Sequence, residues 1–220
     1  MGKSRRARPL RRIVVDRVFS LLARFLKWRG SRRFWQWRYL LGGSSGAGSY
    51  GPEALAKAKY INAFFQREHI HAAVELGCGD GGQLELLKVG RYHGIDISAE
   101  AISRCRRIFA LVDGRSFSLT TDAVTGDFDA ALSLDVIYHL VENEVYEAYL
   151  ERLFGFGAIW VLIYSSNPKQ LVRTAPHVLH RPVGRDVLRR FPHYQVVEDH
   201  SCRSDSLNAG FLLLRRRSPV

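Results

Sequence analysis

A glycine-rich turn carries the clearest chemical signal in the sequence. Gly77, Gly79 and Gly82 follow an apolar run with the spacing G-x-G-x-x-G. Glycines at such a position let the backbone turn tightly and approach a ligand closely, which suits a nucleotide-like cofactor. Cys78 lies inside the turn without a neighbouring His, so we interpret it as a small filling side chain and not as a nucleophile. The glycine spacing alone fits two kinds of cofactor and also a tight connection without a ligand, so the flanking residues decide.

Two carboxylates flank this turn and distinguish between the kinds of cofactor. Asp96 follows Gly79 by seventeen residues, where its side chain could accept hydrogen bonds from the hydroxyls of a ribose. Glu75 stands two residues before Gly77, where a carboxylate suits an ammonium group but repels a dinucleotide pyrophosphate. We therefore favour a nucleoside cofactor with an amino-acid tail over a dinucleotide.

Three blocks of the sequence together resemble the class I S-adenosylmethionine-dependent methyltransferases. They are ELGCGDG at residues 75–81, GIDIS at 94–98 and FDAALSLDVIYHL at 128–140, in the family's order and spacing. The resemblance covers roughly residues 54–215. The stretch SGAGSYG at residues 45–51 is similar to a segment of small bacterial members of the family, many of which are thought to modify glycans or related envelope components.

The resemblance implies S-adenosylmethionine as the cofactor and a set of residues around it. The methionine part would be surrounded by the end of the first strand, the glycine turn and the Gly/Ser-rich loop: Glu75, Gly77, Cys78, Gly79, Ser49 and Tyr50. The ribose and the adenine would be met by residues that follow the second and third strands: Asp96, Ile97, Asp122 and Ala123. The sulfonium would lie near the end of the fourth strand: Leu134 and Asp135. Residues 120–127 are too few for the helix that the family usually has there, and Asp122 also fits a simple turn residue.

A histidine near the end of the fourth strand is the leading candidate for acid–base chemistry. Methyl transfer from a sulfonium is an in-line displacement governed mainly by positioning, and a hydroxyl acceptor benefits further from a general base. His139 follows Leu134 by five residues and is our candidate base, with a structural histidine as the alternative. His177 and His180 are weaker candidates in a segment expected to cover the substrate. We predict methyl transfer to oxygen in a glycan, lipid-linked or other small envelope-related acceptor.

The elements that must position these residues follow from hydrophobic periodicity. After residue 71, short apolar runs alternate with helical ones, which indicates βαβ units and a parallel sheet. We predict strands at residues 72–76, 92–96, 116–119, 128–134, 158–164, 194–198 and 207–214. We predict helices at residues 52–68, 82–88, 99–109, 142–154 and 184–190. The predicted fold is one doubly wound α/β domain of the Rossmann-like methyltransferase type, with a mostly parallel seven-stranded sheet whose last strand is antiparallel, as the resemblance implies.

The charge of the chain is concentrated at its N-terminus. The net charge is +12, but thirteen of the 33 Lys and Arg residues and only one acid, Asp16, lie in residues 1–40, so residues 41–220 are neutral overall. We therefore predict two parts, a basic amphipathic helical arm at residues 1–40 and a methyltransferase domain at 41–220. Apolar residues at helical spacing in 11–29 and the nearby Trp28, Trp35 and Trp37 favour peripheral contact with an anionic membrane. Nucleic-acid binding, a solvated tail and, in a eukaryotic source, an organellar transit peptide are the alternatives for this arm.

Composition excludes several other classes of protein. The three cysteines are widely spaced and lack a His/Cys ligand cluster, so we expect neither a disulfide framework nor a metal site. No secretory signal is visible, and the longest uncharged stretch, residues 153–168, is too short to span a bilayer. We expect a cytoplasmic enzyme, peripheral at the inner face of the membrane. An RNA methyltransferase that uses the arm is the enzymatic alternative, although the Pro-Pro motif of amino-methylating enzymes is absent after the fourth strand. A non-catalytic cofactor-binding module is the alternative of a different class.

Overall fold

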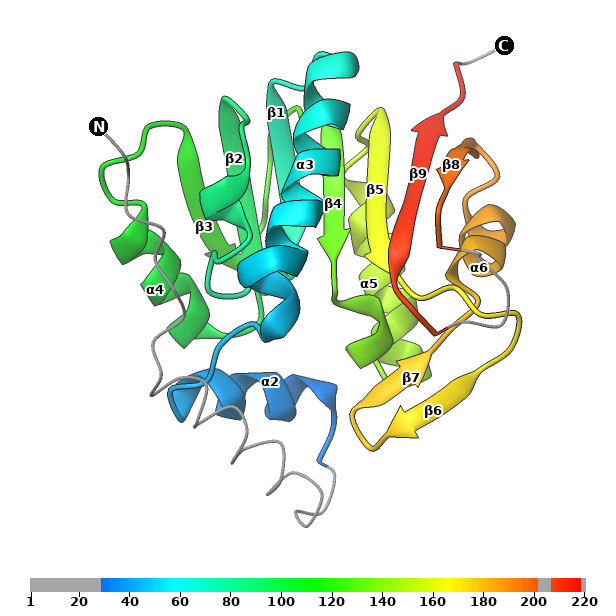
Figure 1. The fold of residues 1–220 in the computed structure, drawn as a ribbon, viewed down its shortest axis with the longest axis horizontal. Coiled ribbons are helices and arrows are strands. Elements are labelled where there is room, and N and C mark those ends of the chain that lie inside the picture. The colour runs from blue at the N-terminus through cyan, green and yellow to red at the C-terminus, as the bar shows by residue number, and fades with distance from the viewer. Residues whose placement is uncertain (1–28, 202–206, 219–220) are drawn as a thin grey trace.

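The structure is a computed structural model that describes residues 29–201 and 207–218. Its centre is one seven-stranded sheet with the order β3-β2-β1-β4-β5-β9-β8. Strands β3 to β5 in this order are parallel, whereas β9 is antiparallel to both of its neighbours (Figure 1). The strands are β1 (Ala72–Leu76), β2 (Arg91–Asp96), β3 (Arg115–Leu119), β4 (Ala130–Leu134), β5 (Trp160–Ser165), β8 (Tyr194–Asp199) and β9 (Gly210–Arg216). The predicted Rossmann-like α/β fold, including its antiparallel last strand, is confirmed.

Helices cover both faces of this sheet. Ile61 of α3 and Ile102 of α4 belong to one buried cluster, whereas Leu150 of α5 and Val187 of α6 belong to the other. The central strands β1 and β4 are buried along their whole length, because a sheet that is covered on both faces requires apolar side chains on both. The helices are α3 (Gly51–Arg67), α4 (Ala99–Ile108), α5 (Asn143–Gly155) and α6 (Val183–Arg190), with short 3₁₀ turns η1 (Ala47–Ser49), η2 (Leu84–Leu86) and η3 (Ile137–His139).

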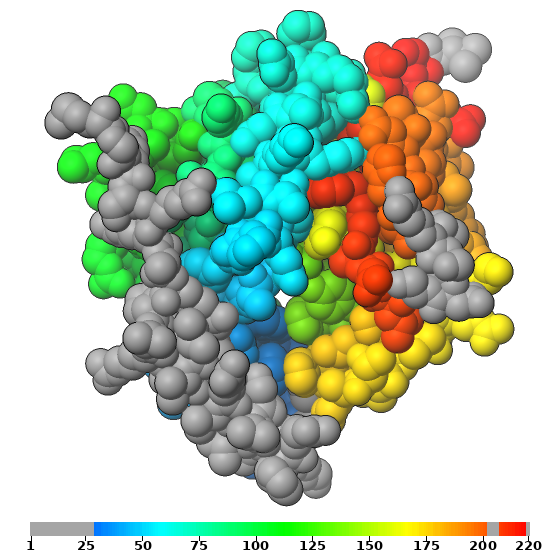
Figure 2. Space-filling model, in the orientation of Figure 1, coloured from blue at the N-terminus to red at the C-terminus, as the bar shows by residue number. Residues whose placement is uncertain are grey.

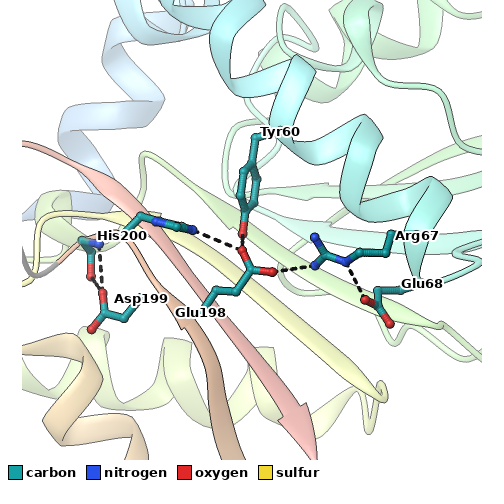
Figure 3. A network of polar contacts seen from close by, with 7 residues as sticks. Tyr60, Arg67, Glu68, Glu198, Asp199 and His200 are labelled. Carbon is teal, nitrogen blue, oxygen red and sulfur yellow. Dashed lines mark hydrogen bonds and ion pairs between the residues drawn. The ribbon is translucent and has the colours of Figure 1, made fainter.

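A polar network fastens α3 to the antiparallel end of the sheet (Figure 3). The Tyr60 hydroxyl donates to one oxygen of Glu198 on β8 at 2.7 Å, and Arg67 pairs with the other at 2.7 Å. The Tyr60 ring also stacks on Phe211 of β9 with the ring centroids 4.0 Å apart. These contacts hold α3 in place across the sheet, so that its N-terminal end reaches the carboxyl ends of the parallel strands.

The helix predicted at residues 82–88 is wrong. Only the 3₁₀ turn η2 forms there, and the chain is held against α3 by side-chain hydrogen bonds instead. Gln83 donates to the carbonyl of Ala54 at 3.1 Å, and Asn62 donates to the carbonyl of Leu86 at 2.9 Å and accepts from the amide of residue 88 at 2.7 Å.

A hairpin that we did not predict follows β5. Strands β6 (Val172–Ala175) and β7 (Val178–His180) pair antiparallel and form a separate two-stranded sheet. Figure 1 shows the hairpin beyond the carboxyl end of β5, and Figure 2 shows a hollow in the surface between this hairpin and α3. The segment that we expected to cover the substrate is thus a small sheet with its own hydrogen bonds.

The helix α2 (Ser31–Leu40) crosses below the carboxyl ends of the strands (Figure 1). It comprises the last ten residues of the predicted arm, whereas the amphipathic helix predicted at residues 11–29 lies almost entirely outside the described residues. The division of the chain at residue 40 stays a prediction. Within residues 29–201 and 207–218, no helix has the length and apolar character that a bilayer-spanning segment requires.

Candidate active site

A cavity of about 260 Å³ lies at the carboxyl ends of the central strands, with α2 as one wall. Its lining includes the candidate base and all but three of the predicted cofactor-binding residues. The residues contributed by strand ends and the turns after them are Glu75, Leu76, Gly77, Cys78, Gly79, Gln83, Asp96, Ile97, Thr120, Leu134, Asp135, Val136, His139 and Leu140. The residues contributed by α2, the Gly/Ser-rich loop and α5 are Ser31, Arg32, Trp35, Tyr39, Ser45, Ser49, Val145, Ala148, Tyr149 and Arg152.

The glycine turn is fixed by backbone hydrogen bonds to the neighbouring strand. The amides of Gly77 and Cys78 both donate to the carbonyl of Ile95, at 2.7 and 3.0 Å. Gly79 has φ +57°, and a Cβ on it would lie 2.2 Å from Oγ of Ser45. Only glycine fits such a position, because both the backbone conformation and the close approach of Ser45 exclude a side chain. The turn therefore leaves room for the loop that closes over it and for a ligand at its surface.

Asp96 at the end of β2 is a buried carboxylate tied to the same turn. Its two oxygens accept from the backbone amides of Gly79 and Ser98, each at 2.9 Å. Burial raises the pKa of Asp96 to about 6, and the two amide donors act against this rise. A group that donates hydrogen bonds into the cavity at this point would stabilise the ionised carboxylate.

Glu75 is the second buried carboxylate, on the other side of the turn. The Tyr92 hydroxyl donates to it at 2.5 Å. Burial raises the pKa of Glu75 to about 7, although this hydrogen bond and the positive charge of Lys57 lower it. Glu75 therefore carries a proton for part of the time near neutral pH, and a cation bound beside it would displace that proton.

An ion pair that the sequence did not suggest lies at the end of β4. Asp135, with φ +61°, pairs with Nζ of Lys57 and accepts from the hydroxyl of Tyr138 at 2.8 Å. Lys57 also lies over the Tyr164 ring, with Nζ 5.0 Å from its centroid. Lys57 falls on the apolar stripe of α3, between Ala54 and residues 58 and 61, and a Lys on the buried face of a helix is the signal that could have indicated it.

His139 lines the cavity next to this pair. Its Nδ1 lies 3.1 Å from the carbonyl of His177, which can only accept, so Nδ1 carries the proton and Nε2 has the lone pair. The Trp35 ring packs edge-on against the His139 ring, with the centroids 4.8 Å apart. The His177 ring lies parallel to the His139 ring, with the centroids 5.9 Å apart. Burial lowers the pKa of His139 to about 3. The imidazole is thus neutral throughout the physiological range.

The other two candidate histidines lie outside the lining. His177 stacks on Phe34 of α2 at 4.6 Å and offers its carbonyl to His139. His180 is held by two hydroxyls, since Nδ1 lies 2.7 Å from Oγ of Ser166 and Nε2 lies 3.1 Å from Oγ1 of Thr174. Both ring nitrogens of His180 therefore have partners within the protein.

Three predicted cofactor-binding residues are absent from the lining. The ring of Tyr50 packs against Gly82, where a Cβ would lie 2.7 Å from it. The carboxylate of Asp122 accepts from the amide of Leu119 at 2.8 Å, so Asp122 acts as a turn residue, and the following Ala123 is exposed. From the short connection after β3, only Thr120 lines the cavity. Arg152 of α5 lies beside it and donates to the backbone carbonyls of residues 120 and 122.

Helix α2 is fastened to the domain at both of its ends. The amide and hydroxyl of Ser31 donate to the two oxygens of Glu142 at 3.0 and 2.6 Å. Near the other end, the buried Arg104 of α4 donates to the carbonyls of Tyr39 at 2.5 Å and Gly43 at 2.6 Å. The Tyr39 hydroxyl lies 2.9 Å from Oγ of Ser45, the residue that covers the glycine turn. These contacts make α2 a structural wall of the cavity.

Within the described residues, no group of His, Cys, Asp and Glu side chains could hold a metal ion.

Comparison with known proteins shows a similarity of part of the chain to one family of domains. Residues 73–156 match the family model described as "Methyltransferase domain". Among curated proteins, no sequence matches the chain.

Similar solved structures share the fold at low sequence identity. N-methyltransferase NodS from Bradyrhizobium japonicum WM9, in complex with S-adenosyl-L-homocysteine, has 17% identity and a TM-score of 0.63, covering 87% of this chain and 100% of that chain. Magnesium protoporphyrin IX methyltransferase (ChlM) from Synechocystis PCC 6803, with bound S-adenosylhomocysteine, has 16% identity and a TM-score of 0.59, covering 90% and 99%. Small RNA methyltransferase HEN1 has 17% identity and a TM-score of 0.59, covering 79% of this chain and 26% of that chain. Residues 73–156 are thus similar to a methyltransferase domain, and the chain has the fold of these methyltransferases.

Proposed function

We propose that this chain, whose residues 73–156 match the model of a methyltransferase domain, transfers a methyl group from S-adenosylmethionine to an oxygen of a small or lipid-linked acceptor. The observation that carries the proposal is the placement of two buried carboxylates, Glu75 and Asp96, on either side of one glycine turn in a single cavity. This arrangement matches the two polar ends of the cofactor, since one end presents an ammonium group and the other the hydroxyls of a ribose.

The residues present fit S-adenosylmethionine. Glu75 would face the methionine ammonium, because a buried carboxylate with its pKa raised to about 7 gains most from a nearby cation. Asp96 would accept hydrogen bonds from the ribose hydroxyls, and Ile97 would lie beside the adenine. Gly77, Cys78 and Gly79 would run along the methionine part, with Ser49 at its carboxylate. The bound cofactor supplies an electrophilic methyl group on a sulfonium.

The chain's own residues would orient the acceptor and accept its proton. Leu134 and Asp135 would border the reacting centre at the end of β4, where the ion pair with Lys57 holds the carboxylate in place. His139 would take the proton of an acceptor hydroxyl at Nε2 as the acceptor oxygen forms its bond to the methyl carbon. Because burial lowers the pKa of His139 to about 3, this base is always in its deprotonated form but takes up a proton only weakly. Its contribution therefore depends on close positioning more than on basicity.

The acceptor class and the location of the protein are also part of the proposal. The resemblance of residues 45–51 to small bacterial enzymes supports a glycan or other envelope-related acceptor, and the basic residues 1–40 support peripheral contact with an anionic membrane from the cytoplasmic side. RNA methylation is the second candidate, favoured by the same basic residues. A non-catalytic module would bind the cofactor without turnover.

Two measurements test the proposal. Calorimetry with S-adenosylmethionine and S-adenosylhomocysteine should show binding that Asp96→Ala weakens strongly, and absence of binding to the wild-type chain would contradict the proposal. A transfer assay with methyl-labelled cofactor should then compare fractionated lipid, glycan and RNA extracts. Label in RNA alone would favour the second candidate, and binding without label in any fraction would favour the module.

The role of His139 is tested separately. His139→Ala should preserve cofactor binding and reduce turnover by roughly a hundredfold, the lower end of the usual contribution of a general base. His193→Ala, at an exposed position between α6 and β8, is the matched control. Unchanged turnover of the His139 variant would remove this residue as the base while leaving methyl transfer itself intact.

A further inference from the structure

Helix α2 has two opposite faces with different environments. Successive helical residues are about 100° apart around the axis, so residues 33, 37, 40 and 41 share one side while Trp35 and Tyr39 share the other. Trp35 and Tyr39 line the cavity. On the opposite side Trp37 is 53% exposed, Leu40 72% and Leu41 58%. We call this second side, which consists of Arg33, Trp37, Leu40 and Leu41, the α2 outer face.

The α2 outer face combines apolar and basic groups in the manner of a surface that lies in a membrane interface. Three large apolar side chains in one patch are costly to leave in water, and Trp is suited to the boundary between headgroups and acyl chains. Arg29 and Arg33 are exposed at the start of the helix. Residues 1–28 immediately precede this helix and contribute nine more Lys and Arg side chains against one acid. Each basic side chain near an anionic leaflet adds to the attraction.

A lipid surface fits these residues better than RNA does. Arginines and Trp37 could contact phosphates and a base, but Leu40 and Leu41 neither stack on bases nor pair with phosphates. The same leucines contribute favourably when they enter the apolar boundary of a bilayer, because their apolar surface then leaves water.

We propose that the α2 outer face docks on an anionic lipid bilayer, and that this docking tightens cofactor binding in the cavity behind the same helix. The second part rests on the proposed function, because it assumes that the cavity binds the cofactor. The physical link is the helix itself. Ser31 at its first turn and Tyr39 at its last are both hydrogen-bonded to the domain and both line the cavity, so a bilayer that holds α2 in its seated position also holds the cavity wall. Such coupling is reciprocal, so bound cofactor should equally strengthen membrane binding.

Vesicle binding of the full chain tests the docking face. Vesicles of phosphatidylcholine mixed with phosphatidylglycerol should bind the wild-type protein in a sedimentation assay, and vesicles of phosphatidylcholine alone should bind it much more weakly. The variant Trp37→Ser/Leu40→Ser/Leu41→Ser should bind the mixed vesicles at least about tenfold more weakly. The control Leu111→Ser/Val112→Ser removes apolar side chains that are 98% and 45% exposed. They lie on the turn before β3, at the amino end of that strand, whereas α2 lies at the carboxyl ends. This control should bind vesicles as the wild type does.

Calorimetry with S-adenosylhomocysteine tests the coupling. Mixed vesicles should tighten its binding to the wild-type chain about fivefold or more, the lower range of measured couplings between sites. The triple variant should bind S-adenosylhomocysteine as the wild type does in solution, which shows an intact cavity, and should not respond to vesicles.

Several results would overturn the inference. Equal vesicle binding by the wild type and the triple variant would assign membrane contact to residues 1–28 alone. Equal binding to vesicles with and without phosphatidylglycerol would show that docking does not require an anionic lipid. If the triple substitution weakened binding of a single-stranded RNA while neither protein bound vesicles, RNA would be the partner. Unchanged S-adenosylhomocysteine affinity with vesicles would remove the coupling. Absence of S-adenosylhomocysteine binding under all conditions would contradict the proposed function and the coupling with it, while the vesicle comparison would still decide the docking face.

Discussion

Lys57 of α3 forms a buried ion pair with Asp135 at the end of β4. The Lys57 side chain is 3% exposed and that of Asp135 is 17% exposed. A buried ammonium group requires such a partner, because its desolvation is otherwise uncompensated. The pair joins the helix that enters the domain to the strand end where we place methyl transfer, so it links the stability of the fold to the geometry of the candidate site.

Loss of the Lys57 cation should destabilise the protein through Asp135. We expect Lys57→Met to lower the free energy of unfolding by about 3 kcal/mol, since it leaves a partly buried carboxylate without its counter-charge. The double variant Lys57→Met/Asp135→Asn should recover a substantial part of this loss. Lys59→Met, exposed on the same helix, is the control for the substitution itself. Urea unfolding measures all four proteins, and equal losses in the single and double variants would show that the charge on Asp135 is not the cause.

Cofactor affinity should fall as the solution becomes acidic. Burial raises the pKa of Glu75 to about 7, so below that pH the free protein carries a proton that an ammonium ligand must displace. Affinity for S-adenosylhomocysteine should therefore drop by up to about tenfold for each pH unit below about 7, and Asp96, with its pKa raised to about 6, should steepen the decline further. Calorimetry across this range gives the slope.

The variant Glu75→Gln separates the two carboxylates in that experiment. It should bind the cofactor product weakly at every pH and should show no decline between about pH 8 and pH 6.5, because its amide does not titrate there. The exposed Glu85→Gln should retain the wild-type profile. A wild-type affinity that is flat across the range would show that Glu75 does not meet the ammonium.

The same substitution should stabilise the ligand-free protein at alkaline pH. The pKa of Glu75 is raised from 4.5 to about 7 by burial, so the stability that its proton contributes is fully present below 4.5 and is lost as the pH rises through 7. Glu75→Gln, which is always neutral, should therefore raise the free energy of unfolding on the order of 3 kcal/mol at about pH 8 and change it little at pH 4. Thermal unfolding at the two pH values measures the difference. A variant that is less stable than the wild type at both would indicate that its amide does not fit the site.

Loosening of α2 should weaken cofactor binding before it affects the rest of the fold. Arg104 is buried and donates to the backbone carbonyls of Tyr39 and Gly43, so Arg104→Met would leave these acceptors near α2 without their partner. We expect roughly tenfold weaker binding of S-adenosylhomocysteine, together with faster amide exchange in residues 31–44 than in the wild type. Arg107→Met, exposed one turn further along α4, should show neither change. Unaltered exchange in α2 would mean that its other contacts are sufficient.

Much of the fold could be predicted from local pattern. The strands and the main helices follow apolar periodicity, and β1 was placed residue for residue because its apolar run ends at the glycine turn. The helix expected at residues 82–88 failed because tertiary contacts override a local pattern there. Gln83 is hydrogen-bonded to the backbone of Ala54 on α3, 29 residues away in the sequence, and no local pattern encodes that contact. The hairpin of β6 and β7 was missed because its two strands are short and only partly buried.

By itself the sequence determined that the two carboxylates and the glycine turn lie together. Glu75, the glycine turn and Asp96 lie at or beside the ends of adjacent parallel strands, and parallel pairing brings such ends to one edge of the sheet. Only the tertiary structure decided the rest of the cavity. Lys57 contacts Asp135, 78 residues away in the sequence, and Tyr39 contacts Arg104, 65 residues away. No spacing along the chain predicts which residue either of them contacts. These contacts depend on where α3 and α2 pack. Burial of its apolar face against the sheet places α3, whereas hydrogen bonds to Glu142 and Arg104 place α2.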